Sequence, residues 1–93
     1  MKLRLESGED AEARAFDGSQ FTLWSPRAFA PGSPVRFLAW FEEGERPLEG
    51  RALGSKRVDG HQFEVRVRFV NLRRDDRQRL LEQLESQRFD ESD

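Results

Sequence analysis

The chain of 93 residues contains no cysteine, no isoleucine and only one histidine, His61. Disulfides and thiolate metal sites are therefore excluded, and one imidazole is too few for a histidine-based zinc site. No segment approaches the roughly 18 consecutive apolar residues of a membrane span, and residues 1–6 lack the apolar run of a signal peptide. We therefore expect a cytoplasmic protein that binds no metal and does not enter a membrane.

Neither sign of charge dominates, because 16 Lys and Arg are set against 18 Asp and Glu, a net charge of −2. Proteins that bind nucleic acids or membrane surfaces usually carry a basic excess, so neither partner is expected. Adjacent acids at 42–43 and 75–76 fall in surface segments, and the chain has no nucleophile elbow, phosphate loop or dinucleotide fingerprint. The sequence therefore predicts a binding protein and not an enzyme.

The chain has enough apolar material for one small core. Hydrophobic residues make up 35% of it, and eight Phe and two Trp supply much of the apolar area. A chain of this length forms one domain. We place that domain at residues 1–89 and interpret residues 90–93, which are mostly acidic, as a solvated tail.

Alternating polarity predicts several strands. The clearest is 62–69, where Phe and Val alternate with Glu and Arg at the period of a half-buried strand. The Asp-Gly pair at 59–60 predicts a hairpin before it, residues 17–19 predict a turn, and the glycines at 50 and 54 predict bulges or bends. The other expected strands are 2–6, 12–16, 20–25, 35–41 and 48–58, the last opened by Pro47.

The pattern changes to that of a helix after Asn71. Residues 72–85 are good helix formers, and Asn71 is the expected N-cap. A single apolar stripe of this helix, which needs a sheet to pack against, consists of Leu72, Leu80, Leu81 and Leu84. A sheet of a few short strands covers one face of every strand only by closing or nearly closing. We therefore predict a mainly β fold, a small six-stranded antiparallel barrel with a C-terminal α-helix.

Three segments together resemble the PilZ domain. They are residues 30–37, which include Gly32-Ser33-Pro34-Val35, residues 48–57, and residues 63–69, which end in Val67-Arg68-Phe69. With the helix that follows, the resemblance covers about residues 12–88. It implies a PilZ-like barrel and a stand-alone bacterial signalling domain of the cyclic di-GMP receptor family.

The resemblance also implies where a ligand would bind. PilZ domains hold cyclic di-GMP through an R-x-x-x-R arm before the first strand and a D/N-x-S-x-x-G motif at a strand junction. This chain has Asp17 and Ser19 of the second motif, with Thr22 in place of its glycine, and it lacks the arm. The resemblance therefore implies a degenerate nucleotide site at Asp17 and Ser19 and action through a protein partner, as a monomer or homodimer.

Several arginines extend this prediction. Guanidinium groups pair with phosphates and guanine edges, so Arg14 and Arg66 are candidates to replace the missing arm. Arg73 and Arg77 match R-x-x-x-R only as a string, because they follow the last strand. The candidates for a partner interface are Trp24, Arg68, Arg73 and Arg74.

Each of these candidates also has an ordinary structural interpretation. Asp17 and Ser19 suit a turn that caps itself, and strand arginines suit a solvated sheet face. Two further functions stay open. One is a working cyclic di-GMP receptor that recruits Arg14 or Arg66, and the other is a small barrel that binds single-stranded nucleic acid through exposed aromatics and arginines.

Overall fold

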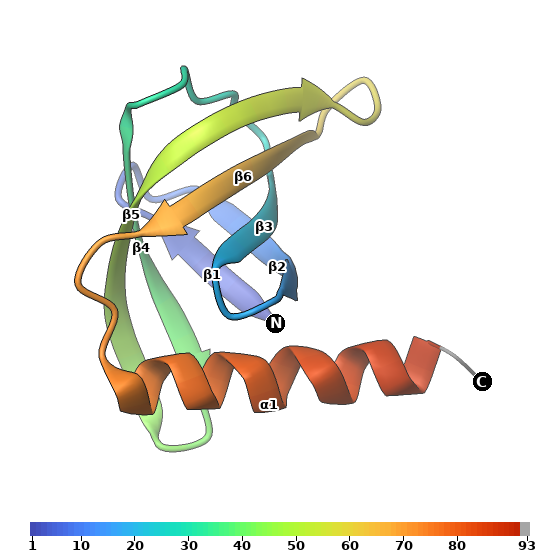
Figure 1. The fold of residues 1–93 in the computed structure, drawn as a ribbon. Coiled ribbons are helices and arrows are strands. Elements are labelled where there is room, and N and C mark those ends of the chain that lie inside the picture. Colours follow the sequence, from blue (N-terminus) through green and yellow to red (C-terminus); the bar gives the residue numbers. More distant parts are fainter. Residues whose placement is uncertain (92–93) are drawn as a thin grey trace.

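The computed structural model describes the backbone of residues 1–91 and the side chains of residues 1–84. Figure 1 shows a barrel of strands with one helix across its end. The elements are β1 (Lys2–Leu5), β2 (Asp10–Phe16), β3 (Gln20–Ser25), β4 (Pro34–Phe41), β5 (Gly44–Arg57), β6 (Phe63–Phe69) and α1 (Arg74–Glu91).

The strands form a closed antiparallel barrel in the order β1-β2-β3-β6-β5-β4. Pairing of β1 with β4, with Leu3 opposite Ala39, closes the cylinder. The register shifts between Ala13 and Ala15 in β2 and between Ala52 and Gly54 in β5, and such bulges increase local twist and curvature. The predicted six-stranded barrel with its C-terminal helix is confirmed.

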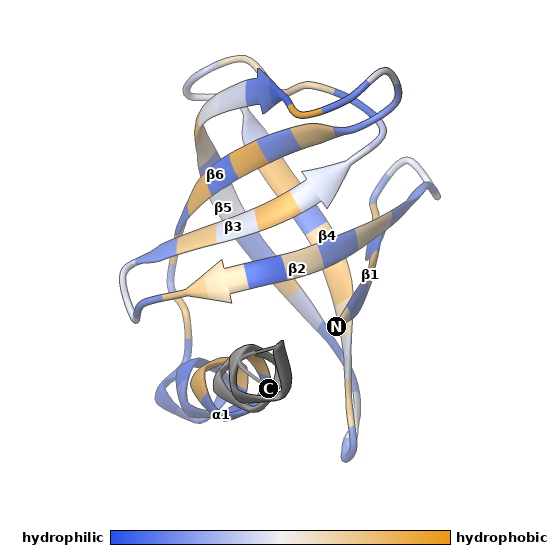
Figure 2. Ribbon diagram, turned by 90° about the vertical axis from the view of Figure 1, so that its right-hand side faces the viewer, coloured by the Kyte–Doolittle hydropathy of each residue, from blue (hydrophilic) through white to orange (hydrophobic). Residues whose placement is uncertain are grey.

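The core fills the barrel with alternate side chains of every strand, and Figure 2 shows the matching alternation of hydropathy along β2, β3 and β6. Aromatic rings form its centre. Phe21 stacks on Phe37 with ring centroids 5.6 Å apart, and Phe69 lies 5.0 Å from Phe21. The strict alternation in the sequence therefore works as predicted, with one face of each strand inside the barrel.

Helix α1 lies across one end of the barrel (Figures 1 and 2). Leu80 and Leu84 are buried against the core, and Leu72 and Leu81 are packed against it with partial exposure. The predicted stripe therefore covers the barrel end, where the strands leave apolar side chains without a neighbour.

The helix begins later than predicted. Its first residue is Arg74, and Asn71 has a φ of 56°, so Asn71 is not the N-cap and Leu72 is not helical. After β6 the chain must turn sharply to reach the barrel end, and asparagine tolerates the left-handed conformation that this turn uses. The helix continues to Glu91, so the backbone of two residues of the predicted acidic tail is helical, while the tail's side chains lie outside the described residues.

Strand β5 begins at Gly44, earlier than the predicted start at residue 48, and it contains Pro47. Proline has no N–H, so it cannot donate a hydrogen bond to a neighbouring strand and is disfavoured in a strand that is paired on both sides. Pro47 is tolerated because β5 pairs there only with β4, opposite Leu38, whereas pairing with β6 begins at Gly50. In the described part of the chain, no helix is both long and apolar enough to cross a membrane.

Candidate functional site

Strand register places the predicted site residues on the outer surface of β2, β3 and β6. Thr22 lies opposite Arg66, Gln20 lies opposite Arg68, and Trp24 lies opposite Glu64. Arg66 and Arg68 alternate with the buried Val65 and Val67 and so point outwards. Side chains that lie 40 to 48 positions apart in the sequence therefore share one face of the barrel.

The Asp17 carboxylate is hydrogen-bonded within the β2–β3 turn. Asp17 Oδ1 accepts hydrogen bonds from the backbone amides of Ser19, at 2.8 Å, and Gln20, at 2.7 Å. The amides of Gln20 and then Ser19 favour the charged form, so the pKa of Asp17 lies below its ordinary value of 3.8. Gly18, with a φ of 95°, supplies the left-handed residue of the turn. Asp17 and Ser19 thus form a turn that caps itself.

Arg14 lies over the ring of Trp24, with Cζ 4.3 Å from the ring centroid. Its Nη1 also lies 3.0 Å from Glu12 Oε1. Arg14 has a further interaction beyond these two. This guanidinium is therefore held within the chain by a cation–π contact and an ion pair.

Arg66 lies over Gly54. The register shift in β5 brings Gly54 opposite Arg66, and a Cβ added to Gly54 would lie 3.1 Å from Arg66 Nη2. The Arg66 guanidinium therefore occupies the space that a side chain at position 54 would fill. Arg66 remains exposed and forms no ion pair with any carboxylate of the described residues.

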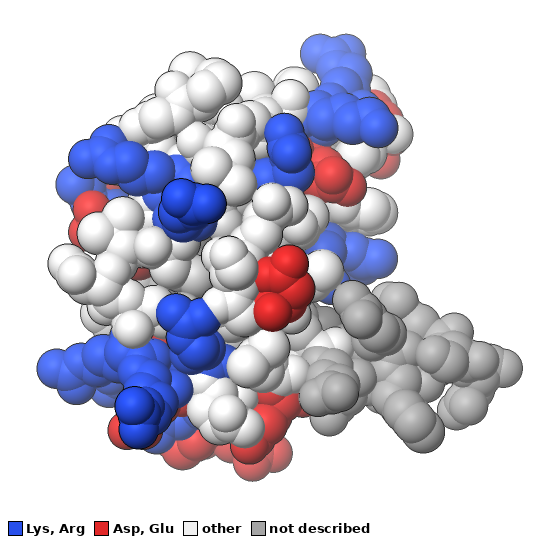
Figure 3. Space-filling view, in the orientation of Figure 1, with Lys and Arg blue, Asp and Glu red and all other residues white. Residues whose placement is uncertain are grey.

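The barrel face seen in Figure 3, on which β5 and β6 lie in Figure 1, carries several groups of Lys and Arg with fewer Asp and Glu between them. By register this face includes Arg51, Lys56, Arg66 and Arg68. Arg73 and Arg74 lie outside the strands, in the connection to α1 and at its first residue. The predicted site residues Arg14, Asp17, Ser19, Trp24, Arg66 and Arg68 thus lie on the neighbouring strands β2, β3 and β6 and on the β2–β3 turn, whereas Arg73 and Arg74 follow β6.

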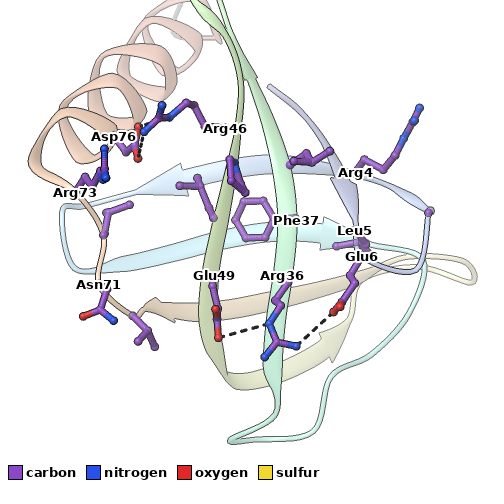
Figure 4. Close-up of a pocket in the computed structure, with 16 residues that line it drawn as sticks. Arg4, Leu5, Glu6, Arg36, Phe37, Arg46, Glu49, Asn71, Arg73 and Asp76 are labelled. Carbon is purple, nitrogen blue, oxygen red and sulfur yellow. Dashed lines mark hydrogen bonds and ion pairs between the residues drawn. The ribbon is translucent and has the colours of Figure 1, made fainter.

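A groove of about 930 Å³, which the sequence did not predict, lies between β1, β4, β5 and the connection that leads to α1. In Figure 4 the Arg36 side chain lies between Glu6 and Glu49, at 3.6 Å from each carboxylate. Arg73 lines the same groove. Its residues come from three strands, two connecting segments and the first turn of α1, so no local pattern in the sequence could have found it.

Asp76 fixes one side of this groove. Its buried carboxylate accepts hydrogen bonds from Arg46 Nε at 3.2 Å, from Arg46 Nη2 at 3.4 Å and from Arg79 Nη1 at 3.3 Å. Arg79 Nε in turn donates to Glu43 at 2.9 Å. These contacts join the β4–β5 hairpin to α1, so the charges of this cluster hold the fold together.

Nowhere among the described residues do three or more His, Asp or Glu side chains gather as ligands for a metal ion. No protein-family model, no curated protein and no solved structure matches the chain.

Proposed function

We propose that this barrel is a PilZ-like bacterial signalling domain with a degenerate nucleotide site, and that it acts in the cytoplasm by binding a protein. The observation that carries the proposal is the Asp17 carboxylate, whose Oδ1 accepts two backbone hydrogen bonds within its own turn. The proposal also draws on the resemblance of residues 12–88 to the family.

Two features of the predicted site, at Arg14 and at Thr22, disfavour binding of a dinucleotide. Arg14 is engaged by Trp24 and Glu12, so its use as a phosphate ligand would require breaking those contacts. Thr22 adds a side chain where the family has glycine, next to Arg66, and so restricts close approach of a ligand to the strand. Both features favour a surface that contacts a protein over one that encloses a dinucleotide.

A working cyclic di-GMP receptor is the second candidate, and Arg66 and Arg68 favour it. They are exposed, they lie two residues apart on the same side of β6, and the register places Arg68 beside Gln20, next to the β2–β3 turn. Two guanidinium groups in this position could contact a phosphate, as the missing arm does in the family.

Binding of single-stranded nucleic acid has less support. Such binding uses exposed aromatic rings as stacking platforms, and Arg14 already lies over the Trp24 ring. Trp40, the other tryptophan, has the Arg4 guanidinium 5.6 Å from its ring centroid.

Titration of the ¹⁵N-labelled protein with cyclic di-GMP, followed by proton–nitrogen NMR, separates the first two candidates. We expect no saturable shift of the Ser19 and Gln20 amides. A Kd below about 10 µM, roughly −7 kcal/mol, with shifts centred on that turn, would contradict the degenerate site and establish the receptor. In that event Arg66→Gln should weaken binding, whereas Arg77→Gln, an exposed arginine on α1, should not.

A further inference from the structure

Two arginines face each other directly across β5 and β6. Arg51 lies opposite Arg68 in the register, and both side chains point outwards. Side chains in such positions have Cβ atoms about 5 Å apart, and like charges there destabilise a sheet. Arg66, the next outward residue of β6, adds a third guanidinium.

The charges around these arginines do not neutralise them. Arg51 donates from Nη1 to the carbonyl oxygen of Gly32 at 2.9 Å. This hydrogen bond satisfies one N–H donor but does not neutralise the positive charge of the guanidinium. Glu49, the preceding outward residue of β5, pairs with Arg36 at 3.6 Å. Glu64, the preceding outward residue of β6, lies opposite Lys56 and Trp24.

No carboxylate within the described part of the chain forms an ion pair with Arg51, Arg66 or Arg68. The placement of Arg68 opposite Arg51 repels without a compensating ion pair, and a neutral side chain at position 68 would remove the repulsion and leave the Arg51–Gly32 hydrogen bond in place. Departures from local consistency of this kind are expected where a surface serves binding.

An exposed leucine lies beside these arginines. Leu53 falls in the β5 bulge, between Ala52, which lies opposite Val67, and Gly54, which lies opposite Arg66. It is 38% exposed, one of few large apolar side chains so exposed among the described residues. Exposed apolar side chains on the same face as arginines are typical of a protein interface, where arginine is enriched and often contributes strongly to binding.

We propose that Arg51, Leu53, Arg66 and Arg68, the β5–β6 arginine surface, bind an acidic segment of a partner protein. Carboxylates of that segment pair with the guanidinium forks, and an apolar side chain between them packs on Leu53. This inference rests on the proposed protein-binding function and names the chemistry of the partner. A dinucleotide would use the arginines but has no alkyl group to pack on Leu53.

The probe is a blocked synthetic pentapeptide, Glu-Glu-Leu-Glu-Glu, titrated into the ¹⁵N-labelled protein. We expect saturable shifts of the backbone amides of the β5–β6 arginine surface, and weaker binding as NaCl rises from about 50 mM to about 500 mM. Replacing the glutamates of the peptide by glutamine should abolish binding. Replacing its leucine by serine should weaken binding about threefold or more, since the contact with Leu53 is lost.

Charge-removing variants give a second readout that a purely structural role would not give. Arg68→Gln should weaken peptide binding about fivefold and at the same time raise the Tm by about 2 °C, because the repulsion from Arg51 is relieved. Arg77→Gln removes the same charge from α1 and should change neither quantity. Arg51→Gln should behave like Arg68→Gln for the peptide.

The inference would be overturned by a lower Tm for Arg68→Gln, by peptide shifts centred away from β5 and β6, or by equal binding of the glutamine peptide. Dimerisation of the protein through this face, seen in sedimentation velocity and lost in Arg68→Gln, would overturn it by identifying a second copy as the occupant. Failure of the peptide leaves the cyclic di-GMP titration unchanged, so the inference and the proposed function fail separately.

Discussion

Gly50 supports the strand pair that carries the β5–β6 arginine surface, and its replacement tests the packing of the barrel. A Cβ at this position would lie 2.5 Å from Val67 Cγ1 and 2.6 Å from the carbonyl oxygen of Arg68. Ordinary contacts of this kind are nearly 1 Å longer, so one of these neighbours must move. Val67 is completely buried, and Arg68 is held in the β5–β6 ladder opposite Arg51, so neither can move freely.

Gly50→Ala is therefore an overpacking substitution, and such changes cost about 1–3 kcal/mol. Alanine also reduces the conformational freedom of the unfolded chain, which offsets about 0.4–1 kcal/mol where the native geometry is compatible. Because one clash is with backbone, we place the cost at the upper end and expect a net loss of about 2 kcal/mol. For a domain of this size that lowers the Tm by roughly 8–16 °C.

The assay is urea unfolding followed by circular dichroism, with the free energy of unfolding taken from the midpoint at constant slope. Gly60→Ala is the matched control, since a Cβ there meets nothing within 4 Å and Gly60 has no left-handed φ. It should leave stability unchanged or raise it by about 0.5 kcal/mol. If Gly50→Ala is as stable as Gly60→Ala, the close packing between β5 and β6 is wrong.

Three other predictions concern the helix and the β2–β3 turn. Asp76→Asn should lower the free energy of unfolding, measured in urea, by about 2–3 kcal/mol, because the acceptor of three guanidinium hydrogen bonds loses its negative charge. Asp75→Asn, at the exposed neighbouring residue, is the control and should change the free energy of unfolding by less than about 0.5 kcal/mol. Leu80→Ala should cost about 3 kcal/mol because the side chain is fully buried at the barrel end, and a loss below about 1 kcal/mol would contradict this packing. The pKa of Asp17 in the folded protein, measured by carboxyl NMR, should lie below 3.8. The Asp17 carboxylate therefore stabilises the fold above pH 3.8, and this stabilisation disappears as the pH falls through the pKa of the folded protein. Asp17→Ala should remove this pH dependence.

The sequence predicted those parts of the fold that depend on a short-range pattern. Alternation in 62–69 located β6 within one residue, and the Leu80 and Leu84 pair identified the helix face that covers the barrel end. Local chemistry also located the turns, since Asp59 accepts from the His61 amide at 2.8 Å in the β5–β6 hairpin. Boundaries that depend on tertiary contacts were wrong, as for Asn71, whose conformation is set by the route from β6 to the barrel end.

The candidate site was only partly predictable for the same reason. Asp17, Arg66 and Arg68 could be named from motif and charge, but which side chains lie beside them depends on strand register. The opposition of Arg51 and Arg68 needs the pairing of β5 with β6, and nothing in either strand's own sequence specifies it. The buried cluster of Asp76 joins residues about 30 positions apart, as the hydrogen bond from Arg46 shows, and so escapes any local pattern.

The bulge in β5 is a local irregularity that shapes the β5–β6 arginine surface. Up to Ala52 the strand alternates regularly, and without the shift Leu53 would lie opposite Arg66 and Gly54 would point into the barrel. With the shift, Ser55 lies opposite Val65 and exchanges hydrogen bonds with the Phe29 backbone at 2.8 Å, while Leu53 is the unpaired residue of the bulge. Leu53 is outward in either register, and the shift instead leaves it without a cross-strand partner and places Gly54, which has no side chain, opposite Arg66. Ser55→Ala should weaken the contact with the Phe29 backbone, and an accompanying loss of peptide binding without any change at Arg68 would connect the bulge to the β5–β6 arginine surface.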